Sequence, residues 1–253
     1  LTSFVSDPYV NTVIMALIIV GGIGFLVWSD IIICRARFSR LRLHSKMALV
    51  TTAVLIVSGT ALFFIFESNG VLRNMNFGQK LLASMFGSVT PRTAGFNTVD
   101  IASLSQSGLL LTVLLMLIGG SPGSTAGGIK TTTLAVLYAS TRASVRRFND
   151  AVLFKRKILV ESIKLSLAIV VIYLSGVFLF TMVIAAIDSV SMSSALFEVT
   201  SAAGTVGLTT GITSSLSAVS RLILILLMYC GRVGGFSIAI AFTQSHEHVP
   251  VDR

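Results

Sequence analysis

Two short segments of this sequence each combine a threonine, a small or branched residue and a glycine: Thr93, Ala94 and Gly95, and Thr205, Val206 and Gly207. A potassium ion gives up its water only where a ring of backbone carbonyl oxygens replaces it. Successive carbonyls point into one narrow pore only if some residues accept unusual backbone angles, which glycine does at little steric cost. The chemistry that these segments could perform is coordination of a dehydrated cation, although either one alone is also typical of a helix cap or a tight turn.

The two segments belong to a longer internal repeat. An offset of 112 that aligns Gly95 with Gly207 also pairs Thr93 with Thr205, Thr98 with Thr210, Leu115 with Leu227, Met116 with Met228 and Gly119 with Gly231. Each glycine segment follows a short stretch, 78–90 or 191–203, which cannot cross a bilayer core of about 30 Å. We predict that both stretches are re-entrant half-helices. The second segment is also the tripeptide that opens the potassium-channel filter sequence TVGYG.

The composition is that of an integral membrane protein. Of the 253 residues, 54% are hydrophobic and 11% are charged, with a mean hydropathy of +0.91, whereas a soluble domain has roughly 25% charged residues. A soluble enzyme is therefore excluded, and we predict an all-α membrane fold. Five long apolar runs are expected to form helices: 10–33, 47–66, 107–140 with an interruption, 159–187 and 217–243.

The net charge of +9 is concentrated in two loops, 35–46 and 142–157, which carry 11 of the 19 Lys and Arg residues. These residues are Arg35, Arg37, Arg40, Arg42 and Lys46 in the first loop, and Arg142, Arg146, Arg147, Lys155, Arg156 and Lys157 in the second. Both loops are predicted to be cytoplasmic by the positive-inside rule. The alternative is a docking surface for a cytosolic partner or for anionic lipid.

With both basic loops on one side, the two half-helices must enter and leave the membrane from the outer side. Exposed backbone at membrane depth is tolerated only where it is buried in protein or lines a water-filled path, so the glycine segments are expected to line a pore. The units run in parallel, which favours a channel-like ring. Gly21 and Gly22 match the later pair Gly119 and Gly120, and the first helix therefore resembles the end of a further, truncated unit. We assign 1–46 to that unit with its loop, 47–157 to a third repeat and 158–253 to a fourth.

The interruption in the third apolar run is expected to be an intramembrane loop. Residues 107–118 form only about 18 Å of helix at 1.5 Å per residue, so the break falls inside the membrane. The loop consists of Gly119, Gly120, Ser121, Pro122, Gly123, Ser124, Thr125, Ala126, Gly127 and Gly128. It could block the pore or swing aside, and the alternative is a plain kink between packed helices.

Three charged residues lie in or beside the predicted membrane segments. Arg232 lies at the position of the last helix that matches the loop. Because a charge there is costly, we expect it to bond to carbonyls or an acid, although a snorkelling or structural arginine is the alternative. Lys130 is either functional or an interfacial anchor, and Glu198 is either paired with polar groups behind the filter or exposed to ions.

No motif for catalysis, a cofactor or a metal cluster occurs. Cys34 and Cys230 lie at the end of one apolar run and inside another, so neither a disulfide framework nor a Cys/His metal site is expected. His246 and His248 have no third ligand nearby. We therefore predict a protein that is not an enzyme, with no cofactor and no nucleic-acid partner.

Four motifs together resemble the membrane subunit of the Trk/Ktr/HKT potassium transporters, and the Ktr B-type subunit most of all. They are SVTPRTAGFNT (88–98), GGSPGSTAGGIKTTT (119–133), FEVTSAAGTVGLTTGIT (197–213) and GRVG (231–234). The resemblance implies four joined units around one potassium filter, with residues 93–95 and 205–207 on its third and fourth sides. It also implies that 119–128 is the gating loop, that Arg232 contacts this loop, and that the membrane subunit forms a homodimer on a cytosolic ring of nucleotide-binding regulatory subunits.

We therefore expect a multi-pass cell-membrane protein that takes up potassium through a carbonyl filter, gated by the loop and the arginine. Potassium is the transported ion, and a sodium dependence stays open. One alternative is a potassium channel or a sodium-selective relative of the same architecture. A further alternative is a membrane scaffold that transports nothing. The missing first half means that this chain alone cannot enclose a filter.

Overall fold

The computed structural model describes residues 1–35, 37–148 and 150–233. The helices in this part of the chain are α1 (Pro8–Ile23), α2 (Phe25–Ile33), α3 (Leu43–Glu67), α4 (Phe77–Val89), α5 (Gln106–Leu117), α6 (Thr131–Val145), α7 (Val160–Asp188), α8 (Met192–Ala203) and α9 (Ala218–Val233). Short 3-10 turns cover Thr2–Phe4, Phe38–Arg40, Ile101–Ser103 and Ile212–Ser214. The strands β1 (Val152–Leu153) and β2 (Arg156–Lys157) form a small antiparallel hairpin.

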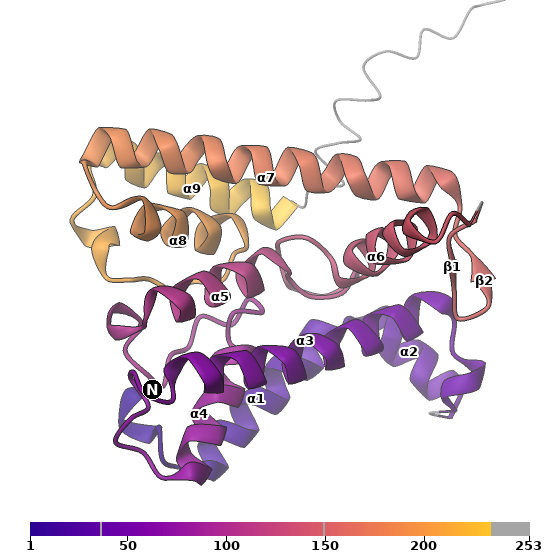
Figure 1. The fold of residues 1–253 in the computed structure, drawn as a ribbon, viewed down its shortest axis with the longest axis horizontal. Helices are drawn as coiled ribbons and strands as arrows, with labels where there is room; N and C mark the ends of the chain where they lie inside the picture. Colours follow the sequence, from indigo (N-terminus) through magenta and orange to yellow (C-terminus); the bar gives the residue numbers. More distant parts are fainter. Residues whose placement is uncertain (36, 149, 234–253) are drawn as a thin grey trace, which may run out of the picture.

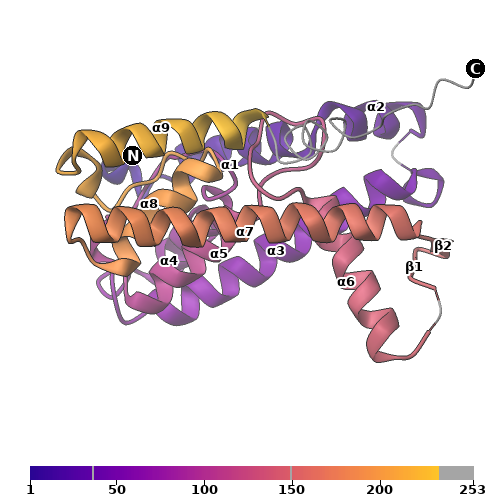
Figure 2. The same ribbon diagram turned by 90° about the horizontal axis from the view of Figure 1, so that it is seen from above.

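The helices lie in three layers (Figure 1). In Figure 1, α7, α8 and α9 lie along the upper edge, α5 and α6 lie in the middle, and α1 to α4 lie below. The short helices α4 and α8 lie at one end of the molecule, and α2 and the β-hairpin lie at the other end in both Figure 1 and Figure 2. Each short helix packs against the long helix that precedes it, α4 on α3 and α8 on α7.

Among the described residues, two helices are long and apolar enough to cross a membrane, and the bent pair α1 and α2 makes a third span if it counts as one. The two helices are α3, with 25 residues and a hydropathy of 2.3, and α7, with 29 residues and a hydropathy of 2.7. Both exceed the roughly 20 residues that a bilayer core requires. The all-α membrane fold predicted from composition is confirmed. The last run, expected over 217–243, is helical from Ala218 to Val233, and the remainder lies outside the described residues.

The first apolar run differs from its prediction as a single helix over 10–33. It is bent by 88° between α1 and α2, and the break falls at Gly24, whose φ is +88°. A Cβ atom on Gly24 would lie 2.7 Å from the carbonyl oxygen of Pro122. The bend therefore depends on the close approach of a segment about 100 residues further along the chain, which no local sequence pattern reports.

The two predicted half-helices are confirmed as short helices. The first, α4, begins with a capping box in which Asn76 and Gln79 satisfy each other's backbone N–H groups. The second, α8, is capped by Ser191, whose hydroxyl accepts a hydrogen bond from the N–H of Ser194 at 3.3 Å. The last turns of both are buried, and Phe197 of α8 joins Phe63 of α3 and Met116 of α5 in the largest apolar core. Each half-helix thus ends inside the protein.

Candidate functional site

The two glycine segments lie side by side, backbone against backbone. Gly95 has a φ of +74° and Gly207 has a φ of +90°. A Cβ atom on Gly95 would lie 2.5 Å from the carbonyl oxygen of Val206 and 3.3 Å from the Cα of Gly207. No side chain separates the segments at this point. The structure therefore brings together the residues that the repeat singled out.

Both segments share one local conformation. The threonines that begin them, Thr93 and Thr205, have φ values of +64° and +54°. A non-glycine residue in this left-handed region carries about 1–3 kcal/mol of strain and needs surrounding structure to hold it. The ends of the half-helices provide part of that structure. The N–H of Ala94 donates to the carbonyl of Thr90 at 3.2 Å, and the N–H of Val206 donates to the carbonyl of Ser201 at 2.8 Å.

A hydroxyl group at the end of each half-helix fixes the backbone just after the glycine. The hydroxyl of Thr90 donates to the carbonyl oxygen of Phe96. In the fourth unit, the hydroxyl of Ser201 donates to the carbonyl oxygen of Leu208 at 2.6 Å. The N–H of Gly207 also donates to Ser201 at 3.2 Å. These bonds leave the carbonyls of the segments themselves free to point elsewhere.

A buried arginine behind the segment 93–95 was not singled out from the sequence. Arg92 directly precedes Thr93 in the sequence, and it is only 3% exposed. One of its terminal nitrogens donates to the hydroxyl of Thr52 on α3 at 3.1 Å. Its place directly before Thr93 in the PRTAG motif was the available signal, but a hydrogen-bond partner on another helix, here Thr52, leaves no local pattern.

The loop 119–128 lies between α5 and α6 and closes on itself. The N–H of Gly119 donates to the carbonyl of Ile129 at 2.9 Å, and the N–H of Ile129 donates to the carbonyl of Leu117 at 3.0 Å. Just beyond this base, the hydroxyls of Ser121 and Thr131 hydrogen-bond at 2.8 Å, and both side chains are fully buried. An unstructured linker would not have such a closed base, so the loop is an ordered element.

The loop packs into the break between α1 and α2. The N–H of Ser121 donates to the carbonyl of Gly22 at 2.9 Å, and the N–H of Phe25 donates to the carbonyl of Gly123 at 3.1 Å. These bonds replace helical hydrogen bonds that the bend at Gly24 removes. The break and the loop are therefore one structural feature.

On its other side, the loop reaches the fourth unit. Arg232 of α9 donates to the carbonyl oxygen of Thr125, which is the kind of partner that its predicted depth demands. Lys130 donates to the carbonyl oxygen of Ala126, so it is bonded to the loop. A Cβ atom on Gly127 would overlap the hydroxyl of Thr205. The loop thus lies directly against Thr205, the residue that begins the segment 205–207.

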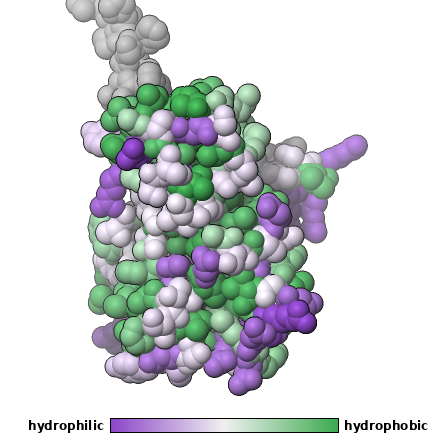
Figure 3. Space-filling view, turned by 90° about the vertical axis from the view of Figure 1, so that its left-hand side faces the viewer, coloured by the Kyte–Doolittle hydropathy of each residue, from purple (hydrophilic) through white to green (hydrophobic). Residues whose placement is uncertain are grey.

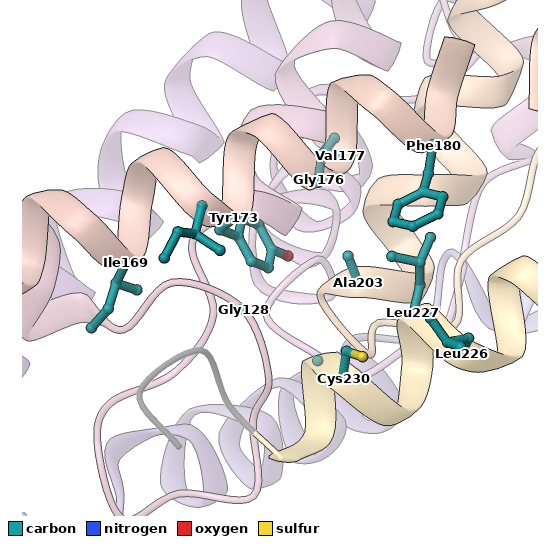
Figure 4. A pocket seen from close by; sticks show the side chains of 12 residues that line it. Gly128, Ile169, Tyr173, Gly176, Val177, Phe180, Ala203, Leu226, Leu227 and Cys230 are labelled. Carbon is teal, nitrogen blue, oxygen red and sulfur yellow. The ribbon is translucent and has the colours of Figure 1, made fainter. Parts of the chain in front are cut away.

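A cavity of about 160 Å³ lies beside the loop, between α7 and α9 (Figure 4). Its lining includes Tyr173 and Val177 of α7, Leu227 and Cys230 of α9, and Gly128 of the loop. Apolar side chains dominate this lining. A dehydrated cation needs oxygen ligands, and the cavity is therefore not the ion path.

Among residues 1–35, 37–148 and 150–233, no group of three or more His, Cys, Asp and Glu side chains could hold a metal ion. His246 and His248 lie outside the described residues. The site therefore rests on backbone carbonyls, hydroxyls and three cationic side chains, those of Arg92, Lys130 and Arg232.

Two helix, half-helix, helix units with glycine segments in backbone contact define the cation-transport class of membrane protein. A family model described as "TrkH: Cation transport protein" matches residues 1–249. The chain belongs to this family, and the Trk/Ktr resemblance seen in the motifs is confirmed. The family consists of transport proteins rather than enzymes.

Named relatives support the same assignment. The chain is 42% identical over 241 residues to the potassium/sodium uptake protein NtpJ of Enterococcus hirae, covering 93% of this chain and 53% of that protein. It is 40% identical to the Ktr system potassium uptake protein B of Bacillus subtilis, covering 98% and 56%. The chain thus spans about half the length of the curated relatives that it matches.

A solved structure shows the same fold. The potassium transporter TrkH from Vibrio parahaemolyticus superposes with a TM-score of 0.79, over 95% of this chain and 53% of that one. The sequence identity is 16%, so this likeness establishes the fold alone.

Proposed function

We propose that the complete protein takes up potassium across the cell membrane through a filter to which residues 93–95 and 205–207 contribute two sides. The observation that carries this proposal is the contact between Gly95 and the carbonyl of Val206, with both glycines at positive φ. Backbone carbonyls held in this manner can replace the hydration shell of a potassium ion. The half-helices α4 and α8 end at the segments, and their negative dipole ends favour a cation there.

We propose further that the loop 119–128 and Arg232 form the gate below this filter. The close approach of Gly127 to Thr205 supports this gate, because it brings the loop against the residue that begins the segment 205–207. The bond from Arg232 to Thr125 supports a latch that holds the loop in place. Because α1, α2 and α9 all hold the loop, its movement would require several bonds to break together.

The proposed orientation puts the basic loops in the cytoplasm. The rings of Phe38 and Phe154 meet edge to face with centroids 6.2 Å apart, which joins the loops 35–46 and 142–157 at one end of the molecule. The opposite end carries α4 and α8, and hydrophilic residues are interspersed among apolar ones across it (Figure 3). This end is the proposed outer face. The repeat boundaries 1–46, 47–157 and 158–253 belong to the same proposal.

The proposed partners are a second membrane subunit, in a homodimer, and a cytosolic ring of nucleotide-binding regulatory subunits. The relative from Bacillus subtilis is named as part of a Ktr system, which supports a multi-component assembly. The joined basic loops would face such a ring. Sodium is the second ion to test, because the Enterococcus hirae relative is named a potassium/sodium uptake protein.

Growth of a host that lacks its own potassium uptake tests this function. The full-length gene should restore growth at low potassium, and potassium uptake should exceed sodium uptake in the same cells. A higher sodium uptake would favour the sodium-selective alternative. Potassium currents at single-channel rates in planar bilayers would favour the channel alternative. Correct membrane insertion without uptake of either ion would favour the scaffold.

A further inference from the structure

Glu198 is a buried acid in the middle of α8, and its carboxylate accepts four hydrogen bonds. It is 4% exposed. One oxygen accepts hydrogen bonds from the hydroxyl of Thr209 at 2.7 Å, and from the N–H and hydroxyl of Thr210 at 2.9 and 3.0 Å. The other oxygen accepts from the hydroxyl of Thr213 at 2.6 Å. Of the two alternatives for Glu198, these hydrogen bonds favour pairing with polar groups over exposure to ions.

Most of the acceptor sites of this carboxylate are used. A carboxylate has about four lone-pair sites, and here Oε1 accepts three hydrogen bonds while Oε2 accepts one. Burying a charge is costly unless it is paired and hydrogen-bonded, and the ion pairs among the described residues do not involve Glu198. Within the described part of the chain, its carboxylate is therefore held by hydrogen bonds and by no Lys or Arg side chain within 4 Å.

All four donors lie on one short segment, 209–213, which begins two residues after the filter glycine Gly207. The backbone between them contains only Leu208, whose carbonyl is already held by Ser201. Glu198 and Ser201 lie on the same face of α8, three residues apart. The half-helix therefore holds the chain beyond the glycine at successive points, and the carbonyls of Val206 and Gly207 take their direction from this attachment.

We propose that Glu198 is the positioning residue that sets the potassium preference of the fourth filter side. Its hydrogen bonds fix segment 209–213, and its charge lowers the electrostatic cost of a potassium ion in the adjoining filter. The proposal deepens the proposed potassium uptake and rests on it. No contact between Glu198 and the ion is required.

The third filter side has no equivalent acid, which provides a matched control. The repeat offset aligns Glu198 with Phe86, an apolar residue of α4 that is 1% exposed. The first acid after Gly95 is Asp100, which is exposed. Its carboxylate accepts hydrogen bonds only within its own turn, from the N–H of Ala102 at 3.2 Å and the hydroxyl of Ser103 at 2.5 Å. Asp100→Asn removes one negative charge near the filter but releases no filter backbone.

The experiment measures potassium uptake by the purified full-length protein in liposomes, with sodium as competitor. Glu198→Gln keeps the volume of the side chain, and Thr213 can turn its hydroxyl to accept from the new amide, so assembly should be retained. We expect the KM for potassium to rise about tenfold, the size of a lost charge-assisted hydrogen bond, with little change in kcat. The ratio of potassium to sodium uptake should fall. Glu198→Asp should recover part of both losses, and Asp100→Asn should match the wild type.

The outcomes separate the inference from the function on which it rests. A wild-type protein that moves potassium while Glu198→Gln keeps its KM and ion ratio would overturn the role of Glu198. Equal losses in Glu198→Gln and Asp100→Asn would also overturn it, because general surface charge would then explain both. If Glu198→Gln fails to assemble, Thr213→Val removes one bond to the carboxylate and should give a smaller shift in the same direction. Wild-type behaviour of that variant would overturn the role as well. A wild type without potassium uptake would overturn the proposed function itself.

Discussion

Gly95 lies against the carbonyl group of Val206, so closely that a Cβ atom on Gly95 would be 2.5 Å from that oxygen. The two residues come from different repeats. Gly207 tolerates more, because a Cβ there would meet only the Cα of Gly95 at 3.7 Å. The contact is therefore asymmetric, because a side chain at Gly95 would clash with the other segment and a side chain at Gly207 would not.

A serine at Gly95 should lower the potassium preference more than a serine at Gly207. Both positions have positive φ, which costs a side chain about 1–3 kcal/mol, but only Gly95→Ser also displaces a neighbouring carbonyl. We expect the ratio of potassium to sodium uptake to fall about tenfold for Gly95→Ser, since 1.4 kcal/mol is a factor of ten. Competition uptake in cells measures it. Gly78→Ser is the control, because a Cβ there meets nothing within 4 Å. An unchanged ratio with normal expression would make Gly95 only a turn.

Shortening the loop should raise potassium flux. Gly119 and Ile129 are already hydrogen-bonded, so removal of 121–127 leaves the base of the loop in place. We expect higher uptake and a weaker dependence on the cytosolic regulatory subunits, as measured with and without them. Ser121→Ala removes only the bond to Thr131, worth about 1 kcal/mol, and should give a smaller rise. Zero flux in a correctly assembled deletion variant would show that the loop is a structural support.

Sequence patterns were sufficient for the repeated parts of this fold. The half-helices and glycine segments could be predicted because a short stretch and an unusual tripeptide recur at one offset. The loop 119–128 could be predicted because five glycines and a proline disfavour a helix strongly. These signals are local, and each is present twice or is unusually strong.

The features that escaped prediction depend on distant partners. The bend at Gly24 occurs inside a uniformly apolar run and is stabilised by Gly123, which is close in space and far in sequence. Arg92 bonds to Thr52 on another helix. Glu67 lies one residue beyond the apolar run predicted over 47–66, and its partner Ser105 lies on a distant part of the chain. A single sequence without related sequences contains no record of such pairs.

Arg232 should restrain flux through both its bonds and its charge. Its guanidinium donates to the carbonyl of Thr125, and a cation near the path also repels a potassium ion. Arg232→Gln removes the charge but keeps a donor, so basal potassium flux should rise while assembly persists. Arg232→Lys keeps a point charge but loses the fork geometry, and its flux should be intermediate. Wild-type flux in both assembled variants would make Arg232 a packing residue.

The C-terminal ends of α3 and α7 are joined to the following helices by the same kind of bond between an acid and a serine. Glu67, at the end of α3, is fully buried and accepts hydrogen bonds from the N–H and the hydroxyl of Ser105 at 3.0 and 2.6 Å. Ser105 is the N-cap of α5. In the next repeat, Asp188, at the end of α7, accepts from the N–H of Ser217 at 3.0 Å. A negative charge at a helix N-terminus is stabilising, so each acid fixes the start of the last helix in its repeat.

Loss of the bond between Glu67 and Ser105 should destabilise the protein without altering its ion preference. Glu67→Gln leaves buried donors poorly paired, at a cost of about 1–3 kcal/mol, and should lower the thermal unfolding temperature of the purified protein. Asp188→Asn should lower it less, because Asp188 is only partly buried and accepts one backbone bond. The double variant Glu67→Gln with Ser105→Ala should lose less than the sum of the two single losses, since both remove the same interaction. Additive losses would mean that the two residues act independently. A changed ratio of potassium to sodium uptake would mean that the end of α3 also affects the filter.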